Sequence, residues 1–255
     1  MLERLDLRRR TRAAGIHLLI SAALAALAAG LVFGLWYPGI FRQVAGGRDL
    51  FLLVTGVDVV LGPLLTFAVF NLKKGWRHLR RDLAVIGAIQ FAALVYGLTT
   101  VYEVRPVAMV FETDRFRTIT ATQVEVSELP KARPDYRRLP LTGPWLLGAR
   151  EASPGDERND ALQRSLEGFD RAQRPQFWQP YSASAQDALA RARPLSALFT
   201  KYPDRADEVK AVLSQLKLDA NNARFLPLMG RGGDWVVILD DAGRLVHYLP
   251  LDGFF

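Results

Sequence analysis

Asp58 is the residue in this chain most able to do chemistry. It lies in the middle of an apolar run of 21 residues, from Leu50 to Phe70. Such a run can cross a hydrocarbon core of about 30 Å, and an acid inside it costs about 2.5–3.5 kcal/mol on insertion scales. Carboxylates at this depth face a protein partner or a wet cavity. Asp58 therefore predicts either a hydrogen bond that locks neighbouring membrane helices or a site for a partner or a proton.

The predicted helix around Asp58 has one polar and small face. Its members recur at i, i+3, i+7 and i+11: Thr55, Asp58, Gly62 and Thr66. Pro63 lies in the same helix and removes a backbone hydrogen bond, which favours a kink. This face is expected to contact either neighbouring helices or a partner.

A second polar side chain, Gln90, lies in the apolar run from Leu83 to Tyr102. Counting along both runs by helical rise, the depth of Asp58 corresponds to Val95 and Tyr96. We therefore expect the Tyr96 hydroxyl, rather than Gln90, to pair with Asp58.

The sequence offers no set of residues that is typical of a catalytic site. Of the three histidines, only His247 falls in the predicted outer domain, and the chain has no cysteine, which excludes disulfides and thiolate chemistry. An intramembrane aspartyl protease needs two acids, but Asp49 and Asp82 lie at the ends of the apolar runs. We expect no enzymatic activity, no cofactor and no metal.

The elements that must position Asp58 are membrane helices. Three apolar runs predict spans at about 13–36, 50–70 and 83–102, so that 13–102 forms a transmembrane domain after a basic segment, 1–12. The first run is too long for the core of a cleaved signal peptide. Residues 103–255 then form one outer domain, and the predicted fold class is a three-helix membrane protein with a small α+β domain.

The basic excess belongs to the membrane half. Residues 1–102 contain 12 Lys and Arg against 5 Asp and Glu, whereas residues 103–255 contain 21 of each. This pattern argues against nucleic-acid binding and for topology signals and lipid headgroups. Ten basic residues precede the first and third spans, and only Arg42 and Arg48 precede the second. By the positive-inside rule, the N-terminus is cytoplasmic and the outer domain periplasmic. The ten are Arg4, Arg8, Arg9, Arg10, Arg12, Lys73, Lys74, Arg77, Arg80 and Arg81.

Small residues recur every four positions in the first span: Ala22, Ala26, Gly30 and Gly34. This spacing lets two membrane helices approach closely. Two interpretations remain open: packing against another helix of the same chain, or a groove for the helix of another protein. A groove of that kind would lie near Asp58 and Gly62.

The outer domain is expected to begin and end with strands. The residue pattern predicts strands at Val107–Glu112, Phe116–Ile119, Arg224–Met229, Trp235–Leu239 and Leu245–Leu249. It also predicts a hairpin turn at Asp240-Asp241-Ala242-Gly243. Helices are predicted over Glu157–Phe169, Ser184–Arg193 and Arg205–Leu218. Residues 130–154 hold five prolines without a period and predict loop. Gly230-Arg231-Gly232-Gly233 is interpreted as a flexible connector.

The chain resembles the TfpX/TfpZ-type accessory proteins of type IV pilins, which are membrane proteins of Gram-negative bacteria. The resemblance is carried by Trp36-Tyr37-Pro38, Gly56–Thr66, Arg81–Gly97 and Arg105–Phe116, and more loosely by Trp235–Asp252. The resemblance implies an inner-membrane accessory protein that binds and stabilises a cognate pilin and modulates pilus assembly. The contacts would be made to the membrane helix and the periplasmic head of the pilin. A homo-oligomer remains possible. The alternative, from Asp58 alone, is a small proton-coupled transporter or membrane sensor.

Overall fold

The computed structural model describes residues 2–71, 75–219 and 221–255. Lys73 and Lys74, which contribute to the predicted topology signal, lie outside these residues. The chain divides into two compact units. One contains Met1–Pro38 and Gly47–Val104, and the other contains Gly39–Gly46 and Arg105–Phe255.

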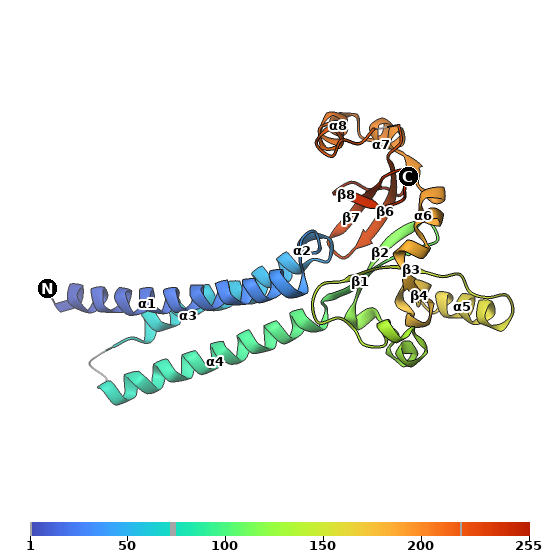
Figure 1. Ribbon diagram of the computed structural model, residues 1–255. Coiled ribbons are helices and arrows are strands. Elements are labelled where there is room, and N and C mark those ends of the chain that lie inside the picture. Colours follow the sequence, from blue (N-terminus) through green and yellow to red (C-terminus); the bar gives the residue numbers. More distant parts are fainter. Residues whose placement is uncertain (1, 72–74, 220) are drawn as a thin grey trace. The chain divides into compact units, whose positions relative to one another are not determined.

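The first unit consists of long helices: α1 (Leu2–Leu31), α3 (Gly47–Val69) and α4 (Trp76–Glu103) (Figure 1). A π-helical turn, η1 (Val32–Trp36), continues α1. In the described part of the chain, three segments are long and apolar enough to cross a membrane: Leu7–Trp36, Gly47–Val69 and Trp76–Glu103. The chain is a membrane protein with three such helices followed by a helix-and-sheet domain, as the sequence predicted.

Within the first unit, α3 packs against both α1 and α4. Small residues permit the close approach of α3 and α4. A Cβ at Gly62 would collide with the side chain of Gln90, and a Cβ at Gly97 would collide with Val54. Without a hydrophobic driving force in lipid, such close packing is what holds membrane helices together.

Tyr37 joins the end of α1 to the end of α4. Its ring is fully buried, and its hydroxyl donates to the carbonyls of Val101 (3.1 Å) and Val104 (3.0 Å). Gly47 lies against the same ring, where any Cβ would collide with it. A buried tyrosine hydroxyl needs such acceptors, and here it finds them at the carbonyls that end α4.

The second unit is built on one mixed sheet (Figure 1). Its strands are β1 (Pro106–Glu112), β2 (Arg115–Thr120), β3 (Trp145–Ala149), β4 (Trp178–Pro180), β5 (Arg193–Pro194), β6 (Arg224–Gly230), β7 (Gly233–Leu239) and β8 (Leu245–Leu249). Their order is β4-β3-β1-β2-β6-β7-β8, with β5 paired to the start of β6. Every residue of β1 is buried, which explains why its sequence is apolar without alternation.

The strand β3 corrects the prediction that residues 130–154 are loop. It pairs in parallel with β1, from Ala108 opposite Trp145 to Phe111 opposite Gly148, and antiparallel with β4. A short apolar run between prolines has no period that marks a strand. Only its place beside the buried β1 makes it one.

Helices and short turns cover the sheet. The helices are α5 (Asp156–Leu166), α6 (Ala185–Arg191), α7 (Leu195–Lys201) and α8 (Ala206–Gln215). The 3-10 turns are η3 (Ala121–Gln123), η4 (Val126–Lys131), η5 (Pro134–Tyr136), η6 (Arg171–Gln173), η7 (Pro175–Phe177), η8 (Tyr181–Ala183) and η9 (Pro203–Arg205). Separate apolar clusters form around Phe116, around Trp178 and around Phe225. The core of this unit is therefore divided among three clusters.

The segment Gly39–Gly46, with its short helix α2 (Phe41–Val44), packs inside the second unit. The Gly232 N–H donates to the Val44 carbonyl at 2.9 Å. A Cβ at Gly232 would collide with the Gln43 carbonyl, and a Cβ at Gly230 with that of Val44. Gly230 and Gly232, two of the three glycines predicted as a flexible connector, are thus required for a close backbone contact.

A candidate intramembrane site around Asp58

A cavity of about 270 Å³ lies among the three helices of the first unit. Most of its wall is apolar, and its polar groups come from all three helices. The lining residues are His17, Ile20, Ser21, Leu24 and Ala25 of α1, Thr55 and Asp58 of α3, and Gly87, Gln90, Phe91 and Leu94 of α4.

Gln90, and not Tyr96, is the neighbour of Asp58. Its Nε2 donates to the backbone carbonyl of Asp58 at 3.0 Å, because Gly62 lets the two helices approach at that point. Tyr96 lies on another face of α4 and is 76% exposed. The expected pairing of Tyr96 with Asp58 is therefore wrong.

The carboxylate of Asp58 is not used for packing. Asp58 is half-buried and lines the cavity, but its side chain makes no hydrogen bond or ion pair with another residue in the parts that the structure describes. The Oε1 of Gln90 is buried and also lacks a partner among those residues. The Asp58 side chain thus lines the cavity without a partner among the described residues, whereas the Gln90 Oε1 is packed against Gly62 and has no open surface.

The remaining members of the predicted polar face of α3 point inward. Thr55, Gly62 and Thr66 are buried, and the Thr55 hydroxyl donates to the Phe51 carbonyl at 2.8 Å. Pro63 is half-buried, and α3 continues past it. This face is therefore the surface by which α3 packs on its neighbours.

His17 is a site residue that the sequence reasoning missed. Its Nδ1 lies 2.5 Å from the Thr66 hydroxyl, which joins α1 to α3 at one end of the cavity. The signal was available, because His17 and Ser21 are polar residues one helical turn apart in an apolar run. Ser21 is only 8% exposed, so this face of α1 faces the interior.

The small-residue face of α1 is exposed. Ala22, Ala26 and Gly30 of α1 and Gly34 of η1 are all exposed, and a Cβ at either glycine would meet no described residue within 4 Å. In contrast, α1 buries Ala28 between these positions. None of the four small residues lines the Asp58 cavity, so the structure separates this face from Asp58 and Gly62, next to which the sequence had placed it.

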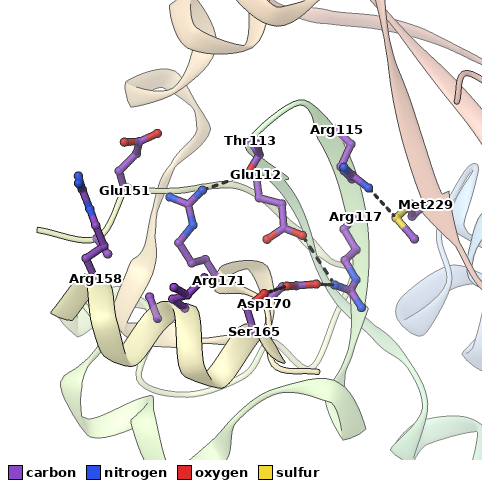
Figure 2. Close-up of a pocket in the computed structure, with 13 residues that line it drawn as sticks. Glu112, Thr113, Arg115, Arg117, Glu151, Arg158, Ser165, Asp170, Arg171 and Met229 are labelled. Atoms are coloured by element: carbon purple, nitrogen blue, oxygen red, sulfur yellow. Dashed lines mark hydrogen bonds and ion pairs between the residues drawn. The ribbon is translucent and has the colours of Figure 1, made fainter. Parts of the chain in front are cut away.

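A second, charged cleft of about 570 Å³ lies in the second unit, between α5 and the turn that joins β1 to β2 (Figure 2). Glu112 is 7% exposed, and its Oε2 accepts the Ala172 N–H at 2.9 Å. Burial raises the pKa of its carboxyl group above the ordinary value. Arg117 lies 2.5 Å from Asp170 and 3.7 Å from Glu112, so these three charges satisfy one another.

Three aromatic residues next to Pro180 in the sequence, Phe177, Trp178 and Tyr181, are buried in the core of the same unit. In the described ranges 2–71, 75–219 and 221–255, no group of three or more metal-binding side chains is found.

Comparison with known proteins identifies the family. A family model described as fimbrial assembly protein FimB matches residues 5–46. The serogroup I fimbrial assembly protein of Dichelobacter nodosus is 38% identical over 242 residues, which is 94% of each chain. The chain belongs to the fimbrial assembly protein family. The serogroup E1 member from the same bacterium is 37% identical over the same length and the same shares.

A further family member, from D. nodosus serogroups C1 and C2, is 43% identical over 118 residues, which is 46% of this chain and 90% of that protein. No solved structure matches the chain. Because two family members align over 94% of the chain, the similarity extends over both units, the helices around Asp58 and the helix-and-sheet domain.

Proposed function

We propose that this chain is a non-enzymatic assembly factor for type IV pili in the bacterial inner membrane. In this proposal it binds a cognate pilin and stabilises it before assembly. The full-length similarity to fimbrial assembly proteins supports the role in pilus assembly, and the three apolar helices support a place in the membrane.

The exposed face of Ala22, Ala26, Gly30 and Gly34 carries the proposal. Glycine within a helix costs about 1 kcal/mol relative to alanine. At Gly62 this cost is offset by close packing on Gln90, but Gly30 and Gly34 have no such neighbour in the described part of the chain. A face of this kind is suited to a helix from another protein, and the membrane helix of an unassembled pilin is our proposed occupant.

The topology supports the same partner. Five basic residues near the start of the chain favour a cytoplasmic N-terminus, and with three spans we propose that the second unit lies in the periplasm. The globular head of a membrane-held pilin lies on that side. We propose that the membrane helix of pilin contacts α1 and that its head contacts the helix-and-sheet domain.

The test is co-purification of pilin with this protein from detergent-solubilised membranes. The double variant Ala26→Leu, Gly30→Leu fills the face with bulk and should abolish recovery of pilin. Leu27→Phe is the control, since Leu27 is 73% exposed on the same helix, and it should leave recovery unchanged. Equal recovery with all three proteins would refute docking on this face.

Pilin abundance tests the role itself. In a strain lacking this gene, an immunoblot of membranes should show less pilin before any pilus is built. Normal pilin with altered surface pili would instead indicate a role in assembly or retraction. Unchanged pilin and unchanged pili would contradict the proposal.

A second candidate function, proton-coupled transport or sensing, is favoured by one observation: the Asp58 side chain lines a cavity and has no protein partner among the described residues. Three helices without an inverted repeat form a poor transporter unless they oligomerise. Asp58→Asn distinguishes the two functions. It should abolish a proton-coupled activity but leave pilin recovery intact if the chain acts through the α1 face.

A further inference from the structure

The charged cleft of the second unit contains two guanidinium groups, of Arg158 and Arg171, that form no ion pair with a carboxylate among the described residues. Arg171 bonds only to neutral groups, the Arg150 carbonyl and the Thr113 hydroxyl, each at 3.1 Å. The side chain of Arg158 is exposed and makes no hydrogen bond or ion pair with any residue in the described ranges. Figure 2 shows Arg171 with Arg158 on one side and Glu112 on the other.

The cleft is lined by four arginines and three acids, so positive charge exceeds negative charge by one in its wall. Glu112 and Asp170 both face Arg117, and Asp170 also accepts the Ser165 hydroxyl at 2.7 Å. Glu151 is the remaining acid in the lining, and neither Arg158 nor Arg171 forms an ion pair with it in the described structure. An anionic group entering between Arg158 and Arg171 would therefore meet complementary charge.

One face of α5 forms a wall of the cleft. Arg158, Ala161, Leu162 and Ser165 line it at i, i+3, i+4 and i+7. Leu162 is 64% exposed, and Met229 on the opposite wall is 37% exposed. A small inorganic anion would leave this apolar surface in water, whereas a peptide can cover it with the side chains that flank its acid.

We propose that the cleft between α5 and the β1–β2 turn binds an acidic segment of a partner protein, with the carboxylate between Arg158 and Arg171. Its volume of about 570 Å³ falls within the usual range of about 300–1,000 Å³ for binding pockets. This inference rests on the proposed function, because the partner is the head of the pilin that the chain would hold.

Binding of detergent-solubilised pilin to the full-length protein in lipid nanodiscs tests the site. Arg158→Glu should weaken binding about tenfold, since it replaces attraction by repulsion, and the loss should shrink at high salt. Arg138→Glu makes the same charge change at an exposed position of this domain outside the cleft and should leave binding unchanged. Equal affinity for both variants would overturn the proposal.

Photo-crosslinking provides an independent readout. A photoreactive amino acid at position 162 should crosslink to an acidic stretch of pilin. The same group at 166 is the matched control, because Leu166 is 84% exposed on the same helix but does not line the cleft. Crosslinks of equal yield from both positions, or from neither, would refute docking in the cleft.

Two further outcomes separate the hypotheses. If Arg158→Glu abolishes binding to phosphatidylglycerol vesicles but not to pilin, the cleft binds lipid phosphate and the peptide proposal is wrong. If the wild-type chain captures no pilin at all, the proposed function fails, and this inference fails with it. If the double variant Ala26→Leu, Gly30→Leu no longer binds pilin but Arg158→Glu binds it as the wild type does, only the cleft proposal fails.

Discussion

The buried ion pair of Arg174 and Glu128 should dominate the stability of the helix-and-sheet domain. Their side chains are 2% and 7% exposed. Glu128 Oε1 accepts both the Nε (2.8 Å) and the Nη2 (2.7 Å) of Arg174, which also contacts Asp160 at 2.5 Å. Removing one partner of such a pair costs about 3–5 kcal/mol, because the other charge stays buried alone.

The pair is also incompletely satisfied. Glu128 Oε2 and Arg174 Nη1 are buried without partners among the described residues, so the desolvation cost of the two charges is not fully offset. We therefore expect Arg174→Met to lose about 3–5 kcal/mol. The double variant Arg174→Met, Glu128→Met should lie within about 1 kcal/mol of wild type or exceed it.

The assay is thermal unfolding of the full-length protein in detergent, followed by tryptophan fluorescence. Trp178 reports on this region, because Arg174 stacks at 5.0 Å on the neighbouring Phe177. For a domain of this size, about 1 kcal/mol shifts Tm by roughly 2–4 °C, so the single variant should lose about 10 °C. A loss under about 2 °C, or a double variant worse than the single one, would refute the reasoning.

Other variants test the remaining contacts. Gly62→Leu should cost at least about 1–3 kcal/mol by overpacking the α3–α4 contact, whereas Gly56→Leu, where nothing lies within 4 Å of a Cβ, should leave detergent Tm unchanged. Burial raises the pKa of Glu112 in the folded protein above its ordinary 4.5, so the stability of the wild type should fall as pH rises from 4.5 through that pKa. Glu112→Gln should lack this decline. A stability difference between the two proteins that does not change with pH would contradict the reasoning. Gly232→Ala should lower Tm through its clash with a backbone carbonyl, but Arg231→Ala should not.

Much of the architecture follows from local sequence signals. Long apolar runs predicted the three membrane helices, since a span needs only length and apolarity. The hairpin between β7 and β8 was predicted because Asp240 to Gly243 carry turn chemistry, and the Asp240 carboxylate accepts the backbone N–H groups of Ala242 (3.0 Å) and Arg244 (2.8 Å).

Features set by tertiary contacts were not predictable. The strand β3 exists because β1 lies beside it, and the charged cleft joins residues from 112 to 229 that no sequence spacing links. The helix α5 buries none of its residues and contacts the rest of the domain through ion pairs. Arg150 hydrogen-bonds Glu157 at its start and holds the pKa of that carboxyl at about 2.

The contacts of Asp58 also distinguish two roles between which the sequence could not decide, helix packing and a site for a partner or a proton. The α3–α4 contact uses the backbone carbonyl of Asp58, to which Gln90 donates. Any residue at position 58 would supply that oxygen. The carboxylate is therefore not required for this packing, yet an ionisable group at this depth is costly. We therefore expect Asp58→Asn to leave the α3–α4 contact intact, so that any loss of function in this variant would report on a role of the carboxylate toward a partner's donor or a proton.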